Sequence, residues 1–119
     1  MNKRPNPEQI KDSEKTNQGL GVVYLYKAVG SDTVKVGEKR FLCKIGYTKN
    51  TAEKRCRQLQ TGMPYELLLL GQIVSTEYKK VEKELHMRYK DRKHQREWFW
   101  LTLEIIADLY EGDGMVYTE

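Results

Sequence analysis

The sequence predicts an α+β domain in which a small antiparallel or mixed three-stranded sheet is flanked by helices. Three short runs rich in β-branched, aromatic and aliphatic residues predict the strands, and three segments with apolar residues at helical spacing predict the helices. The chain has 119 residues, of which 39% are hydrophobic and 32% charged, which suits one small domain. We therefore expect functional groups on a face or in a shallow cleft rather than around a large cavity.

The first predicted strand covers residues 19–28, an aromatic and β-branched run too short for an ordinary helix. A turn-rich stretch leads to a second strand at 41–47, and the short connection favours an antiparallel pair. The third strand covers 65–74, where four consecutive leucines and Ile73-Val74 indicate a buried central position.

Hydroxyl and amide residues mark where the predicted helices begin. Thr51 or Asn50 can cap a helix that runs to about Gln60, with Gly62 after its end. Thr76 precedes a long helix at 77–91, and Thr102 precedes a last amphipathic helix.

The polar residues 1–18 are expected to form a disordered arm, 19–111 the single domain, and 112–119 a short acidic tail. No apolar run approaches the length of a membrane span, and no hydrophobic stretch follows the opening residues as in a signal peptide. Cys43 and Cys56 are too few and too poorly spaced for a disulfide framework. We expect reduced thiols and a cytoplasmic protein with no membrane partner.

Positive charge is concentrated in two stretches of a chain whose net charge is +4. Residues 35–57 hold eight Lys/Arg and two Glu, and residues 79–100 hold eight Lys/Arg and four Asp/Glu. Residues 101–119 hold five acidic residues and no basic one. This asymmetry favours a nucleic-acid partner on the basic stretches, although charge runs are also ordinary solvated faces.

Alternation along the strands places Tyr24 and Tyr26 on one face of the first strand and Lys44 and Gly46 on one face of the second. If Cys43 and Ile45 point into the core, the paired strands present tyrosines beside a lysine and a glycine. A glycine lets another molecule approach the backbone closely. The alternative is a tyrosine pair that covers the core and a solvated lysine.

Two charged residues border the apolar stripes of the helices. Arg55 lies between Ala52 and Leu59, where its neighbours would hold the guanidinium in a position that suits a phosphate. Glu82 lies four residues from both Tyr78 and His86. The alternative for Glu82 is a surface ion pair with nearby lysines.

A zinc site and a serine or cysteine hydrolase are not supported. His86, His94 and the two cysteines lack the spacing of zinc ligands, and there is no Gly-rich phosphate loop.

An ordered series of short motifs resembles the GIY-YIG nuclease family over residues 21–101. The series is Tyr24 in Val22-Val23-Tyr24, Lys44-Ile45-Gly46, Arg55, Glu82 with Leu85-His86, and Glu97-Trp98-Phe99. It is most similar to the phage-associated branch, whose second motif reads KIG and whose end reads ExxLH and then EWF. Lys44 stands where the family usually has a second tyrosine, and Val22 stands where its first motif has a glycine.

The resemblance implies metal-dependent hydrolysis of a DNA phosphodiester, with Mg²⁺ or Mn²⁺ as the cofactor. Tyr24 would be or assist the general base, Lys44 would bind phosphate or lower the Tyr24 pKa, Arg55 would bind the scissile phosphate, and Glu82 would hold the metal. Further DNA contacts are assigned to Tyr26, Lys49, Arg57 and His86. The expected substrate is double-stranded or branched DNA, and a phage or mobile element is an expected source.

Two other functions stay open from the sequence. One is a DNA-binding module that keeps the basic face without cleavage. The other is a phage protein that binds another protein through Trp98-Phe99-Trp100, a cluster that is otherwise part of the core.

Overall fold

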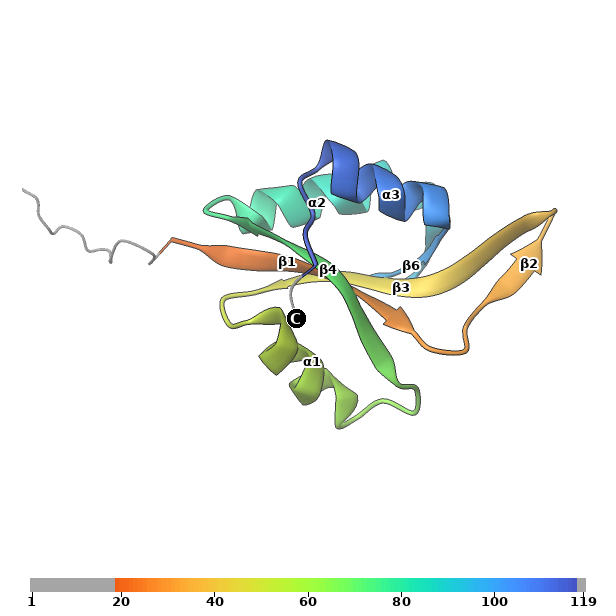
Figure 1. Cartoon of the computed structure of the whole chain (residues 1–119), viewed down its shortest axis with the longest axis horizontal. Coiled ribbons are helices and arrows are strands. Elements are labelled where there is room, and N and C mark those ends of the chain that lie inside the picture. The colour runs from red at the N-terminus through yellow and green to blue at the C-terminus, as the bar shows by residue number, and fades with distance from the viewer. Residues whose placement is uncertain (1–18, 118–119) are drawn as a thin grey trace, which may run out of the picture.

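A computed structural model describes residues 19–117, so the arm expected at 1–18 lies outside the described residues. Within this range the chain forms six strands, three α-helices and one 3₁₀ turn (Figure 1). In chain order they are β1 (Gly21–Ala28), β2 (Thr33–Lys35), β3 (Glu38–Thr48), α1 (Ala52–Gln60), β4 (Leu67–Ser75), α2 (Tyr78–Arg88), η1 (Lys90–Arg92), β5 (Lys93–Gln95), β6 (Trp98–Leu101) and α3 (Leu103–Gly112).

The strands form one antiparallel sheet in the order β4-β1-β3-β6-β5, and β2 pairs with the outer part of β3. The expectation of a small three-stranded sheet is therefore wrong. The three expected strands correspond to β1, β3 and β4, and β2, β5 and β6 extend the sheet.

The additional strands gave no usable signal in the sequence. All residues of β2 and β5 are exposed, and each strand has only three residues, so neither shows an alternation of apolar and polar residues. In β6 all four residues are apolar, and their burial alternates only because the two faces of the sheet are covered differently. The β2–β3 turn places Val36 and Gly37 at φ 53° and 74°, the two-residue geometry that suits the twist of a hairpin.

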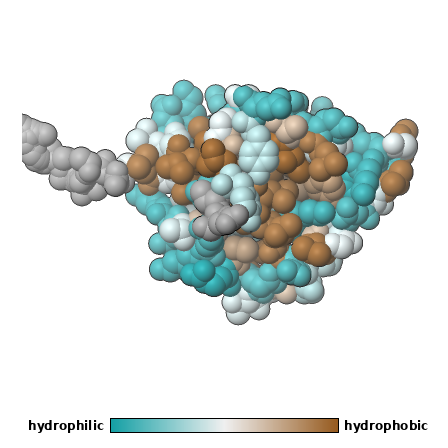
Figure 2. Space-filling view, viewed as in Figure 1, coloured by the Kyte–Doolittle hydropathy of each residue, from teal (hydrophilic) through white to brown (hydrophobic). Residues whose placement is uncertain are grey.

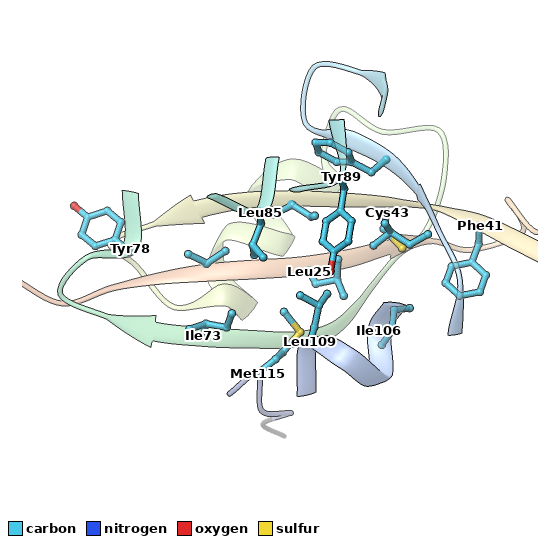
Figure 3. Packing of buried hydrophobic residues seen from close by; sticks show 14 residues of the cluster. Leu25, Phe41, Cys43, Ile73, Tyr78, Leu85, Tyr89, Ile106, Leu109 and Met115 are labelled. Atoms are coloured by element: carbon cyan, nitrogen blue, oxygen red, sulfur yellow. The ribbon is translucent and has the colours of Figure 1, made fainter. Parts of the chain in front are cut away.

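Helices α2 and α3 cover one face of the sheet, and α1 covers part of the other (Figure 1). The main core lies on the α2 and α3 side, where Leu25 and Cys43 of the sheet meet Leu85 and Leu109 of the helices (Figure 3). Phe99 of β6 belongs to the same core. Burial in this core raises the pKa of the Cys43 thiol to about 12. The thiol is therefore protonated at neutral pH and packs as a small apolar side chain.

Two of the expected caps are present. The Thr51 hydroxyl accepts from Lys54 N at the start of α1, and the Thr102 hydroxyl accepts from Ile105 N at the start of α3. The N-cap of α2 is Glu77, without a side-chain hydrogen bond, rather than Thr76, and α2 ends at Arg88.

A second, smaller core lies between α1 and the β1–β4 side of the sheet. Tyr24 and Tyr26 of β1 are buried there with Ala52 of α1, and their rings stack with centroids 4.4 Å apart and planes 12° apart. Cys56 and Leu59, on the stripe that the sequence predicts for α1, pack against this cluster. This small core positions the candidate site described below.

The chain after α3 packs on the sheet. Met115 is buried, and Val116 forms a bridge with Gln72 of β4. Asp113 makes a two-bond ion pair with Arg88 of α2.

Figure 2 shows hydrophobic residues gathered across the middle of the displayed face. Among residues 19–117, no helix has the length and apolar character that crossing a membrane requires.

Candidate functional site

The site is centred on Gly46 of β3, which lies directly opposite Tyr24 of β1. A Cβ atom at Gly46 would lie 2.7 Å from Tyr24 Cζ and 2.8 Å from Glu97 Oε1, and closer still to the Tyr24 hydroxyl. Only a glycine therefore leaves room for the phenol and the carboxylate to approach the same point of the sheet. The predicted alternation of Lys44 and Gly46 on the face of the two tyrosines is confirmed by the register.

Arg55 brings a positive charge to the Tyr24 hydroxyl. Its guanidinium shares a hydrogen bond with the Tyr24 side chain, and because a guanidinium only donates, the phenol oxygen accepts. Burial raises the pKa of Tyr24 above its ordinary value of 10.0, and the bond from Arg55 offsets part of this effect. Tyr24 is therefore a neutral phenol at neutral pH.

Helix α1 fixes Arg55 because the arginine borders the buried face. Arg55 is partly buried, whereas its neighbours Lys54 and Arg57 are exposed. The backbone N–H of Arg55 donates to the Thr51 carbonyl in the first turn of the helix. The prediction that Arg55 borders the apolar stripe is confirmed by this placement.

Lys44 and Glu97 form an ion pair on the same side of the sheet. Lys44 Nζ lies 3.0 Å from Glu97 Oε1 and 5.5 Å from the centroid of the Trp98 ring. The Lys44–Glu97 ion pair follows from the β3–β6 register. Lys44 lies opposite Trp98, and the next residue of β3, Ile45, donates its N–H to the carbonyl of Glu97 at 2.9 Å, so Glu97 lies beside Lys44.

Glu82 reaches this cluster from α2, which covers the opposite face. The β6 ladder ends at Lys44, and the Ile45 carbonyl just beyond it accepts a bond from His86 Nε2 at 2.8 Å. Since a carbonyl only accepts, this bond places a proton on Nε2. His86 thus holds α2 against this edge of β3, and Glu82, one helical turn earlier, lies with its Oε2 3.6 Å from the same nitrogen.

The charges of the cluster act on one another. Burial raises the pKa of Glu82, His86 and Lys44 lower it, and Glu97 raises it. Both Glu82 and Glu97 in turn raise the pKa of Tyr24. Tyr24, Lys44, Arg55 and Glu82, from β1, β3, α1 and α2, therefore share one electrostatic environment.

The four residues expected to make further DNA contacts lie in different settings. The Tyr26 side chain is fully buried, and its hydroxyl donates to the Ala52 carbonyl at 2.6 Å. Lys49 is exposed beside the start of α1, where it lines a cleft with Asn50 and Thr51. Arg57 is exposed on α1, and His86 is partly buried with its ring edge-on to Phe99.

The carboxylates near Tyr24 suit a hard divalent cation better than zinc. Residues 19–117 contain no group of three or more His, Cys, Asp or Glu arranged to hold a metal. Glu82 is a carboxylate with 13% side-chain exposure and a raised pKa, so its negative charge is incompletely balanced. One carboxylate completed by water and phosphate oxygens is an ordinary arrangement for Mg²⁺, and Glu82 is the residue that could hold such an ion.

Sequence reasoning did not select Glu97 as a site residue. It enters the sequence analysis only as the first residue of Glu97-Trp98-Phe99, without a role of its own. Its place beside Gly46 depends on the β3–β6 register, which is a long-range pairing without a local signal.

Fold and site together define a small antiparallel-sheet domain that gathers an arginine, a lysine and two glutamates around a buried tyrosine. A family model, that of the T5orf172 domain, matches residues 21–112, and the chain belongs to this family. The T5orf172 domain is a phage-associated domain. No curated protein and no solved structure matched the chain.

The family match corrects the resemblance to the GIY-YIG nucleases, because the chain belongs to a distinct family. The motif fragments that suggested the resemblance are each short, and two of them departed from the expected pattern at Val22 and Lys44.

Proposed function

We propose that this chain is a metal-dependent endonuclease that hydrolyses DNA phosphodiester bonds. The observation that carries the proposal is that Arg55 bonds the Tyr24 side chain while Glu82 and Glu97, both coupled to Lys44, act on the pKa of Tyr24 from separate elements. Membership of a phage-associated family and the basic stretches at 35–57 and 79–100 support a nucleic-acid substrate.

Arg55 is the residue best suited to bind the scissile phosphate. Its guanidinium is always charged and presents several donors, and Tyr24 occupies one of them, which fixes the direction of the others. A phosphate oxygen placed beside Tyr24 would meet Arg55 on one side. Lys44 would supply a second cation once its contact with Glu97 is exchanged for a phosphate contact.

Glu82 is the residue that we propose for the metal. Burial makes its negative charge unfavourable, and binding of a cation would relieve that cost. When bound there, Mg²⁺ or Mn²⁺ would stabilise charge on the phosphate and lower the pKa of Tyr24 by offsetting the nearby carboxylates. Glu97 would supply a second negative charge near the bound cation, since it lies close enough to raise the pKa of Glu82.

In the reaction a water oxygen attacks phosphorus, the phosphorus–oxygen bond to the leaving strand breaks, and the water proton passes to a base. Tyr24 is a phenol in the described state, so it first acts as a hydrogen-bonding group that orients water or phosphate. It accepts from Arg55 and keeps one O–H with which to donate. It would become the base only after its pKa falls.

DNA is proposed to approach on the side of α1. Lys49, Lys54 and Arg57 are exposed there, close in sequence to Arg55, and are positioned to contact neighbouring phosphates. The buried Tyr26 would support the Tyr24 ring by stacking rather than touch the substrate. Either double-stranded or branched DNA presents such phosphates.

One observation favours a second candidate, a DNA-binding module without cleavage. The raised pKa of Tyr24 keeps the phenol from acting as a base, and the Lys44–Glu97 ion pair already occupies the lysine. Such a module would keep the phosphate contacts of Arg55 and the lysines and lack the chemical step.

Incubation of the purified chain with supercoiled plasmid distinguishes the two. With Mg²⁺ we expect conversion to nicked and linear forms, with none in the presence of a chelator. Arg55→Ala should weaken both binding and cleavage, with the larger loss in cleavage, because charge on the phosphate grows in the transition state. Gln58→Ala, an exposed uncharged residue of the same helix to which no DNA contact is assigned, is the matched control and should bind and cleave like the wild-type chain. Salt-dependent binding without nicking would contradict cleavage and favour the binding module.

A further inference from the structure

The sheet face that carries the site continues beyond α1 as an open surface with two tryptophans. In β6 the side chains alternate, so Phe99 and Leu101 are fully buried in the main core while Trp98 and Trp100 lie on the opposite face. Trp98 lies opposite Lys44 and Trp100 opposite Leu42 in the β3–β6 ladder. The two indoles therefore share the face of Tyr24 and Gly46.

Helix α1 does not extend over this part of the sheet. It packs on β1 and β4, whereas β3 runs past it toward the β2 hairpin (Figure 1). Trp98 packs against the edge of the Tyr24–Tyr26 cluster, and both tryptophans remain partly exposed. The exposed His94 of β5 meets the Trp100 ring edge-on, with centroids 5.5 Å apart. We call Trp98, Trp100 and His94 the aromatic platform.

Basic residues border the aromatic platform. Residues 88–96 include five Lys/Arg and one acidic residue. Arg88 and Arg92 are paired with Asp113 and Glu38, whereas Lys93 and Arg96 are exposed at the β5 edge of the sheet. On the other side, β2 places Lys35 opposite Glu38, on the same face as Lys44. The indoles thus lie between the cations Lys93 and Arg96 at the β5 edge and Lys44 and Lys35 on the β3–β2 side, a charge pattern that complements a phosphate backbone.

We propose that the aromatic platform binds an unpaired DNA strand by stacking bases on Trp98 and Trp100. This rests on the proposed function and deepens it, because it names DNA with a single-stranded segment as the substrate class. Base pairs in a duplex are already stacked, so indoles on a flat sheet face can engage only bases that are splayed out. The platform begins one residue from Glu97, so a strand bound on it would lead directly to the candidate site.

The test measures binding in the presence of a chelator, so that cleavage plays no part. Fluorescence anisotropy would compare a labelled oligo(dT) strand of about 12 nucleotides with a duplex of the same length and with a fork that has unpaired dT arms. The wild-type chain should bind the single strand and the fork more tightly than the duplex. Trp100→Ala should weaken binding of the single strand and the fork about tenfold, the usual effect of losing one stacked base, and leave duplex binding unchanged.

Two variants guard against a loss of folding. Trp100→Phe keeps an aromatic face and should retain most of the single-strand affinity. Tyr117→Ala removes an aromatic residue with 57% exposure that lies away from the platform, and should change nothing. Thermal unfolding of each variant shows whether the fold is kept.

Equal or tighter binding of the duplex by the wild-type chain would overturn the proposal, as would an equal loss of single-strand and duplex binding in folded Trp100→Ala. Tighter binding of an oligo(rU) strand than of oligo(dT) would overturn the assignment to DNA. Single-strand preference without plasmid nicking would contradict cleavage and support the platform. Nicking without single-strand preference would support cleavage and contradict the platform.

Discussion

Replacement of Gly46 by alanine tests the geometry of the site most sharply. The added Cβ would lie 2.7 Å from Tyr24 Cζ and 2.8 Å from Glu97 Oε1, both well inside ordinary contact distance. Glu97 is partly exposed and its carboxylate can move away. Tyr24 has 1% exposure and stacks on the fully buried Tyr26, so its ring cannot move without disturbing the small core.

Overpacking of this kind costs about 1–3 kcal/mol of the free energy of unfolding. For a domain of this size that corresponds to a fall of about 5 to 15 °C in Tm. The displaced phenol would also lose its bond with Arg55, so plasmid cleavage and DNA binding should fall together.

Thermal unfolding followed by circular dichroism measures the stability change, and Gly62→Ala is the matched control. A Cβ at Gly62 meets nothing within 4 Å, so this variant should melt like the wild-type chain. A Gly46→Ala variant with unchanged Tm and unchanged DNA binding would refute the placement of Tyr24 against Gly46.

Three further predictions concern charge and hydrogen bonding. Glu82→Gln should raise Tm at neutral pH, because a carboxyl whose pKa is raised by folding destabilises the fold once the pH exceeds the folded-state pKa. The gain in Tm should disappear at a pH below 4.5, the ordinary pKa of the carboxyl, where Glu82 is protonated in both the folded and the unfolded state. A gain in Tm that does not depend on pH would contradict this reasoning. If four or five phosphates are contacted, DNA affinity measured by anisotropy should fall with a slope of about −4 in a plot of log affinity against log salt concentration. An affinity that does not change with salt would point to another kind of partner. Tyr26→Phe should lower the unfolding free energy by about 1 kcal/mol in a denaturant titration, because the Ala52 carbonyl loses a buried donor, and no change would show that this bond contributes nothing.

The local parts of the fold could be predicted from the sequence. Hydroxyl residues before apolar stripes predicted the caps at Thr51 and Thr102, and strand alternation predicted that Tyr24 shares a face with Gly46. Both alternatives weighed for the tyrosines hold in part: they form a small core, and that core lies beside the charged cluster.

The parts that escaped prediction depend on long-range pairing. β2 and β5 have only exposed residues, so their strand structure comes from their partners rather than from their own composition. The β3–β6 register brings Glu97 to Lys44 and turns Trp98 and Trp100 to the site face, and no short pattern encodes that register. The motif series, which rests on short local patterns, suggested the wrong family.

The central claim is that cleavage requires the Glu82 carboxylate, which α2 holds beside the edge of β3. Its direct test is Mg²⁺-dependent nicking of supercoiled plasmid by Glu82→Gln and by Glu84→Gln, since Glu84 is an exposed carboxylate two residues away on the same helix. We predict that Glu82→Gln abolishes nicking and leaves DNA binding intact or slightly stronger, because a negative charge has left a phosphate-binding surface, while Glu84→Gln cuts like the wild-type chain. Loss of nicking in Glu84→Gln with full activity in Glu82→Gln would contradict the claim.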